Sequence, residues 1–129
     1  VPVEITYGLE RLCMFVQGKN NVFDLDWNND GVKYKEVFFQ AEKEFSAYNF
    51  EFANTDTLLK SFENTENECK SLLEKKLSLP AYDQCLKASH IFNLLDARGV
   101  IGVAERTGYI TRIRELAKGC GALWLSSQT

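Results

Sequence analysis

The sequence contains no uninterrupted apolar stretch near the roughly 18 residues that a membrane-spanning helix requires. It also has no basic excess: 15 lysines and arginines stand against 18 aspartates and glutamates, a net charge of −3. This balance gives no global reason to expect binding to nucleic acid or to a membrane surface. The first residues lack a basic leader followed by an apolar core, so no signal peptide is predicted. The missing initial Met favours a chain cut from a longer one.

The spacing of a zinc site is absent as well. The four cysteines form no CxxC pair, and His90 is the single histidine, so we predict no metal ligands. Cys69, Cys85 and Cys120 fall on apolar helix stripes, and we expect small buried side chains in a reducing compartment. His90 lies close to such a stripe and is interpreted as a core or interface residue rather than a catalytic one.

What the sequence does contain is a hydrophobic content of 45% in 129 residues, enough for one folded domain with a core. Residues 1–6 alternate and are rich in β-branched types, which predicts a short strand. Residues 9–17 predict a helix, or a passage from strand to helix, that ends at Gly18. The asparagines and glycine of residues 19–33 predict a loop with a brief extended piece around residues 22–25.

From about residue 35 onward, apolar residues recur at steps of three and four, which predicts a bundle of about four helices. Asn54 or Thr55 is expected to cap the second helix. Pro80 suits the first turn of the third helix, which Arg98 and Gly99 are expected to end. The side chains predicted to face inward, helix by helix, are Phe38, Ala41, Phe45, Tyr48 and Phe52; Leu58, Phe62, Thr65, Cys69, Leu72 and Leu77; Cys85, Ala88, Phe92 and Leu95; and Tyr109, Ile113, Leu116, Cys120 and Leu123.

The last predicted helix leaves two questions open. Gly119 and Gly121 mark either a close contact between helices or a frayed end, because glycine is unfavourable in a helix interior. The helix is also basic, which suits either a surface that meets a partner or a solvated face with interspersed glutamates. Its basic residues are Arg106, Arg112, Arg114 and Lys118.

Residues 4–11, EITYGLER, are the segment richest in potential chemistry. Alternate side chains of a strand share a face, so we expect Glu4 and Thr6 to point the same way. Gly8 permits the close approach of a ligand, and the planar guanidinium of Arg11 suits phosphate oxygens. On the residues alone, an alternative stays open: a strand with solvated polar side chains and an ordinary Glu–Arg ion pair.

EITYGLER followed by LCMFVQG resembles motif 3 of the class II aminoacyl-tRNA synthetases, in the form found in the alpha subunit of bacterial-type heterotetrameric glycyl-tRNA synthetase. Similar stretches follow in the same order: YNFEFA at residues 48–53, LPAYDQCLKASHIFNLLDARG at 79–99 and AERTGYITRIRELA at 104–117. The resemblance implies the carboxy-terminal portion of such a subunit, with a mainly α fold. It places the end of the antiparallel catalytic sheet, with the motif 3 strand and helix, at residues 1–18. A loop linker at 19–34 and a carboxy-terminal helical domain at 35–129 follow.

The resemblance implies ATP-dependent activation of glycine to glycyl-adenylate and its transfer to tRNA(Gly). Arg11 matches the motif's arginine, which stabilises the ATP phosphates alongside Mg²⁺, and Gly8 and Glu10 belong to the same ATP-binding segment. Glu4 and Thr6 match positions that line the glycine pocket, where the Glu4 carboxylate holds the substrate ammonium. Glu10 is expected to order the site through Arg11 or a nearby backbone group.

The resemblance also implies partners: a second alpha subunit and a beta subunit, in the bacterial cytoplasm or in a eukaryotic organelle. Motifs 1 and 2 are absent from these residues, so the chain alone is not expected to be active. The helices depart from the family pattern at Ala41, Phe52, Ala104 and Gly108. An alternative is therefore a non-catalytic scaffold or interaction module derived from that subunit, although the intact EITYGLER favours the enzyme.

Overall fold

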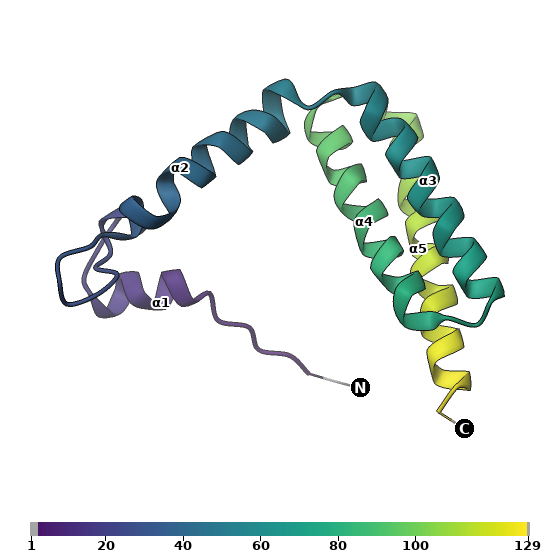
Figure 1. The fold of residues 1–129 in the computed structure, drawn as a ribbon, viewed down its shortest axis with the longest axis horizontal. Coiled ribbons are helices and arrows are strands. Elements are labelled where there is room, and N and C mark those ends of the chain that lie inside the picture. Colours follow the sequence, from purple (N-terminus) through teal and green to yellow (C-terminus); the bar gives the residue numbers. More distant parts are fainter. Residues whose placement is uncertain (1–2, 129) are drawn as a thin grey trace. The chain divides into compact units, whose positions relative to one another are not determined.

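The computed structural model describes residues 3–128. Their regular secondary structure is helical, as predicted: five α-helices, one 3-10 turn and one π-helical turn (Figure 1). The chain divides into two compact units, residues 1–47 (unit 1) and residues 48–129 (unit 2). Unit 1 contains α1 (Leu9–Val16), η1 (Val22–Asp24) and α2 (Tyr34–Ala47); unit 2 contains η2 (Tyr48–Phe52), α3 (Thr55–Glu74), α4 (Ser78–Ala97) and α5 (Val103–Ser126).

The strand predicted for residues 1–6 is wrong over the part described. Residues 3–8 have no regular secondary structure, while residues 1 and 2 lie outside the described residues. The end of an antiparallel sheet is therefore not found. A strand is held by hydrogen bonds to a neighbouring strand, and residues 3–8 meet none in the part of the chain described. Alternation in the sequence does not replace that partner.

The predicted helix of residues 9–17 is confirmed as α1, and it ends where expected. Gly18 adopts a φ of +62°, and the Lys19 N–H then donates to the Met14 carbonyl at 2.8 Å. Such a left-handed residue after a helix favours glycine. The extended piece predicted around residues 22–25 is wrong, because residues 22–24 form the 3-10 turn η1, capped by Asn21. Beyond it, an isolated bridge between Asp26 and Lys33 closes the loop.

Aromatic side chains join α2 to the loop before it. The rings of Phe23 and Phe39 lie 5.0 Å apart between centroids, and those of Trp27 and Phe38 lie 5.4 Å apart. These contacts place α2 in unit 1, and the boundary between the two units falls after residue 47. Among the described residues of unit 1, Leu25 is the one buried side chain, with 3% of its surface exposed.

The inward face predicted for the first helix of the bundle is wrong. Phe38, Ala41, Phe45, Tyr48 and Phe52 are all exposed rather than buried. Periodicity shows that one face of a helix is apolar, but it does not show what covers that face. The expected bundle of about four helices is correspondingly a bundle of three in unit 2, formed by α3, α4 and α5.

The three helices of unit 2 lie side by side, joined by short turns (Figure 1). Their predicted stripes are confirmed except at Leu77, which is exposed in the turn after α3. The buried side chains of these stripes are Leu58, Phe62, Cys69, Cys85, Ala88, Phe92, Leu95, Leu116 and Cys120.

The predicted helix ends of unit 2 are confirmed too. The Asn54 side chain accepts a hydrogen bond from the Thr57 N–H at 2.9 Å and so caps α3. Gly99 ends α4 with a φ of +67°. Arg98 adds a tertiary bond, because its guanidinium donates to the Ala53 carbonyl at 2.6 Å and ties the end of η2 to the end of α4. No helix in the described part of the chain is long and apolar enough to cross a membrane.

Candidate functional site

Arg11 stands in the first turn of α1, shortly after its cap. Gly8 is the N-cap residue, and its carbonyl accepts a hydrogen bond from the Leu12 N–H at 3.0 Å. The Arg11 side chain is exposed and forms no salt bridge with a carboxylate of the described residues. The ordinary Glu–Arg pair that the sequence left open is therefore not found. The guanidinium remains available to an anionic ligand.

An open hollow of about 580 Å³ adjoins Arg11, lined by Gly8, Glu10, Arg11, Met14 and Val22. A Cβ atom added at Gly8 would lie 3.9 Å from the Arg11 Cβ, an ordinary contact. The backbone of Gly8 has a φ of −72° and a ψ of 117°, which other residues adopt as well. The fold of unit 1 therefore does not itself require a glycine here.

Glu4 and Thr6 lie together, as the sequence predicted, although not on a strand. The Thr6 hydroxyl donates a hydrogen bond to the Glu4 carboxylate, and both side chains are exposed. No hydrogen bond or ion pair among the described residues joins this pair to Arg11. The structure thus brings together two of the three predicted groups.

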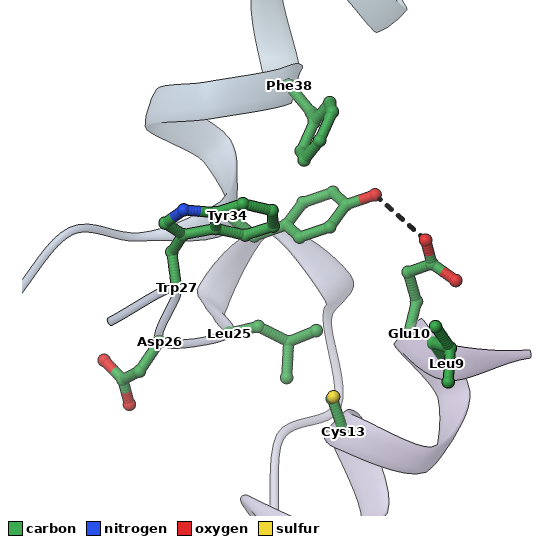
Figure 2. A pocket seen from close by; sticks show the side chains of 8 residues that line it. All are labelled: Leu9, Glu10, Cys13, Leu25, Asp26, Trp27, Tyr34 and Phe38. Atoms are coloured by element: carbon green, nitrogen blue, oxygen red, sulfur yellow. Dashed lines mark hydrogen bonds between the residues drawn. The ribbon is translucent and has the colours of Figure 1, made fainter. Parts of the chain in front are cut away.

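Glu10 finds its partner in a residue that the sequence did not single out. The Tyr34 hydroxyl donates to the Glu10 carboxylate at 3.4 Å (Figure 2). Loss of hydration raises the pKa of the Tyr34 phenol, and the Glu10 carboxylate raises it further. The expectation that Glu10 acts through Arg11 or a backbone group is therefore replaced by a contact with the first residue of α2.

A second hollow, of about 360 Å³, is also lined by Glu10. Its walls are mainly apolar and aromatic, and the carboxylates of Glu10 and Asp26 lie at opposite sides of it (Figure 2). Asp26 pairs with Lys33, and this contact lowers the pKa of Asp26. The lining residues are Leu9, Glu10, Cys13, Leu25, Asp26, Trp27, Tyr34 and Phe38. We call this hollow the aromatic pocket.

Gln17 positions one wall of the aromatic pocket. Its side-chain amide donates to the Asp26 carbonyl at 3.1 Å and accepts from the Asp26 N–H at 2.8 Å. The C-cap residue of α1 is thereby tied to the loop that carries Trp27. Nothing in the local pattern signals this contact, because it joins positions nine residues apart without periodicity.

The predictions for histidine and cysteine divide. His90 is exposed, so it is not a core residue, and its interpretation as an interface residue stays a prediction. Cys69, Cys85 and Cys120 are buried and free, as expected. Burial, with the neighbouring thiols, raises the pKa of Cys69 to about 12, which keeps it an inert thiol. Within residues 3–128 no three His, Cys, Asp or Glu side chains gather to hold a metal ion.

The basic residues of α5 are partly used within unit 2. Arg112 forms a salt bridge with the buried Glu66, and its Nε lies 3.1 Å from one carboxylate oxygen. Arg106 pairs with Asp96 at 3.1 Å. Arg114 and Lys118 are exposed. Two of the four basic residues of α5 are therefore engaged in ion pairs within unit 2, and α5 does not present a basic face that is wholly free to bind tRNA or a partner subunit.

A comparison with known families finds a match that spans both units. The description of the matching family is glycyl-tRNA synthetase alpha subunit, and residues 1–129 are matched. The match includes the segment of Gly8, Glu10 and Arg11, in agreement with the resemblance of EITYGLER. The chain belongs to the glycyl-tRNA synthetase alpha subunit family.

Proposed function

We propose that this chain contributes the ATP-contacting segment of a glycine–tRNA ligase, which activates glycine with ATP and transfers it to tRNA(Gly). The observation that carries the proposal is the exposed Arg11, unpaired with any carboxylate of the described residues beside an open hollow, in a chain of this family. The reaction builds negative charge on the phosphates of ATP, and a fixed guanidinium stabilises that charge.

In the proposed site, Arg11 binds the phosphates and Gly8 leaves room for them. The local fold does not itself require a glycine at position 8. A role in leaving space for the phosphates would therefore explain why a residue without a side chain stands there. Glu10 holds α1 against Tyr34 and so positions the neighbouring Arg11. This part of the mechanism is positioning and charge neutralisation, and it needs no covalent intermediate on the enzyme.

Glu4 and Thr6 are proposed to bind glycine. The carboxylate of Glu4 suits the substrate ammonium, and Thr6 already orients that carboxylate through its hydroxyl. A pocket closed around these groups would reject larger amino acids, because a methyl group would meet close packing.

The described residues offer no protein cage for Mg²⁺, since they contain no cluster of carboxylates, histidines or cysteines. The Mg²⁺ of the proposed reaction would arrive bound to the ATP phosphates, as is usual for this ion. We assign no residue of this chain to it.

The proposed partners are a second alpha subunit and a beta subunit, in the bacterial cytoplasm. Residues outside this segment, those of motifs 1 and 2, would complete the site. The proposal is therefore tested on the synthetase assembled from the alpha subunit that carries this sequence and its beta subunit.

Arg11→Ala is expected to lower glycine-dependent exchange between ATP and pyrophosphate by at least about a hundredfold. Arg11→Lys should recover part of the rate, because the lysine ammonium restores the positive charge but not the planar pair of N–H donors of the guanidinium. Arg114→Ala, which removes an exposed arginine of α5, is the matched control and should retain the rate. Unchanged exchange in Arg11→Ala would refute the role proposed for Arg11.

A second candidate is a non-catalytic interaction module, which the exposed apolar side chains of α2 favour. Phe38, Phe45 and Val37 leave much of their surface open, and large exposed apolar patches mark interaction sites. The assembled protein would then show no glycine-dependent exchange even with Arg11 intact.

A further inference from the structure

Unit 2 contains a complete site for a cationic side chain. Arg112 lies over the rings of Phe62 and Tyr109, with its guanidinium carbon 4.7 Å and 5.0 Å from their centroids. The same guanidinium pairs with the Glu66 carboxylate. One carboxylate and two aromatic faces thus hold an arginine, through an ion pair and through cation–π attraction.

The aromatic pocket of unit 1 has the same kinds of side chain without the cation. Glu10 supplies the carboxylate, and Trp27, Tyr34 and Phe38 supply the rings. The Tyr34 and Phe38 centroids lie 4.7 Å apart, and those of Trp27 and Tyr34 lie 6.2 Å apart. No arginine or lysine of the described residues lines the pocket, and the nearby Lys33 is paired with Asp26 rather than with Glu10. Glu10 has no salt bridge within the described part of the chain.

The Glu10 carboxylate can accept a stronger hydrogen bond than the one it has. Its hydrogen bond from the Tyr34 hydroxyl is long, at 3.4 Å. A carboxylate accepts several hydrogen bonds, including two parallel ones from a guanidinium. Figure 2 shows the Glu10 carboxylate at the edge of the ring cluster, beside the Tyr34 hydroxyl, where a cation between ring and carboxylate would meet both.

The charge of unit 1 also favours a cationic ligand. Residues 1–47 carry eight carboxylates and five cationic side chains, a net charge of −3, whereas residues 48–129 carry ten of each. The net negative charge of the chain therefore resides in unit 1. Such a field attracts a basic partner and repels an acidic one.

We propose that the aromatic pocket binds an arginine side chain presented by a partner polypeptide. Leu9, Leu25 and Cys13 would pack against the methylene stem, and Glu10 with Tyr34 and Trp27 would hold the guanidinium. The volume of about 360 Å³ is at the lower end for ligand pockets, which suits one side chain. A free amino acid fits less well, because no basic residue of the described lining could meet its carboxylate. This site shares Glu10 with the hollow beside Arg11, and its other lining residues are different.

The test is an NMR titration of the alpha subunit that carries this sequence with the peptide acetyl-Gly-Gly-Arg-Gly-Gly-amide. The indole N–H signals of Trp27 and Trp124 report on the two units, since Trp27 lines the aromatic pocket and Trp124 lies on α5. Trp27→Phe and Trp124→Phe variants assign the two signals. The Trp27 signal should shift saturably while the Trp124 signal stays in place.

Three comparisons make the titration specific. A peptide in which neutral citrulline, of the same shape, replaces arginine should bind at least about tenfold more weakly. The arginine peptide should likewise bind the Glu10→Gln variant at least about tenfold more weakly than it binds the unchanged protein. Glu44→Gln removes a carboxylate of α2 outside the pocket and should leave binding unchanged. Arg11→Ala should also leave it unchanged, so failure of this proposal and failure of the Arg11 proposal are distinguishable.

The expected result supports an arginine site. Equal binding of the citrulline peptide, or full binding to Glu10→Gln in a variant whose spectrum shows an intact fold, would overturn it. Absence of any saturable shift of Trp27 would overturn it as well. If free arginine binds as tightly as the peptide, the partner is a small molecule and the polypeptide assignment is wrong.

Discussion

The two units of this chain differ in how far their side chains find partners within the chain. In unit 2, three helices bury a continuous core, and the charged Glu66 inside it is matched by Arg112 and Lys70. In unit 1, Leu25 is the one buried side chain of the described residues, and Trp27 remains 53% exposed. Arg11 and Glu10, both without ion pairs in the described part, also belong to unit 1. The difference separates a region that the chain itself stabilises from a region whose groups are available to ligands.

The largest difference in stability between the two units is expected from a substitution at Phe62, which is 1% exposed. Phe62→Ala is expected to lower the free energy of unfolding of unit 2 by about 4 kcal/mol, because it leaves a cavity and removes a ring from under Arg112. Phe38→Ala, on the partly exposed side of α2, should lower that of unit 1 by only about 1 kcal/mol. Urea unfolding followed by far-UV circular dichroism measures both. Equal losses would contradict the contrast between the units.

A smaller loss is expected at the ion pair of Glu66 and Arg112. Glu66→Ala leaves the guanidinium facing an apolar surface, and we expect a loss of about 2 kcal/mol, reduced because Arg112 is partly solvated. Asp83→Ala, which breaks the exposed pair of Asp83 and Lys87 on α4, is the matched control and should cost less than about 0.5 kcal/mol. A control loss as large as the Glu66 loss would show that burial is not the deciding factor.

The same carboxylate predicts a dependence of stability on pH. The hydrogen bond from Arg112, with a further one from Lys70, holds the pKa of Glu66 below its ordinary 4.5 in the folded state. The unfolded chain therefore takes up the proton first as the pH falls. The stabilising contribution is complete above the unfolded pKa and is lost as the pH falls through the lowered folded pKa. In Glu66→Gln this part of the acid dependence should disappear, which urea unfolding at a series of pH values from about 7 to about 3 would show, and an unchanged profile would exclude the pair as its source.

The smallest effect is expected at the two glycines of α5. A Cβ added at Gly121 would meet open space, so Gly121→Ala should stabilise unit 2 by about 0.5–1 kcal/mol through helix propensity. At Gly119 the added Cβ would lie 3.0 Å from the Leu73 Cδ1, so the gain should shrink or reverse. Thermal unfolding of the two variants side by side checks this. A larger gain for Gly119→Ala would show that α3 and α5 do not pack closely there.

The sequence predicted unit 2 well because its signals are local. Helical periodicity identified Phe62, Cys85 and Phe92 as inward-facing, and the caps at Asn54 and Gly99 depend on residues a few positions apart. The pair of Glu66 and Arg112 was missed, because its members lie 46 positions apart and no pattern links them.

The sequence predicted less of unit 1. The strand predicted for residues 1–6 needs a neighbouring strand, which residues 3–8 do not meet in the described part of the chain. The apolar face of α2 was recognised from its periodicity, but periodicity does not show which residues would pack against that face. In the candidate site, Arg11 and the pair of Glu4 and Thr6 were predicted from the motif, and their roles stay predictions. Tyr34 and Gln17 were not, since their partners lie 24 and nine positions away in the chain.

The most direct test of the central claim, that ATP meets this chain at Arg11, is hydrogen–deuterium exchange on the assembled synthetase with and without ATP. Amides of α1, from Leu9 onward, should exchange more slowly with ATP bound, because bound phosphates hold Arg11 and its helix in place. Amides of α3, α4 and α5 should be unaffected. Unchanged exchange in α1, with protection confined to the helices of unit 2, would contradict the account.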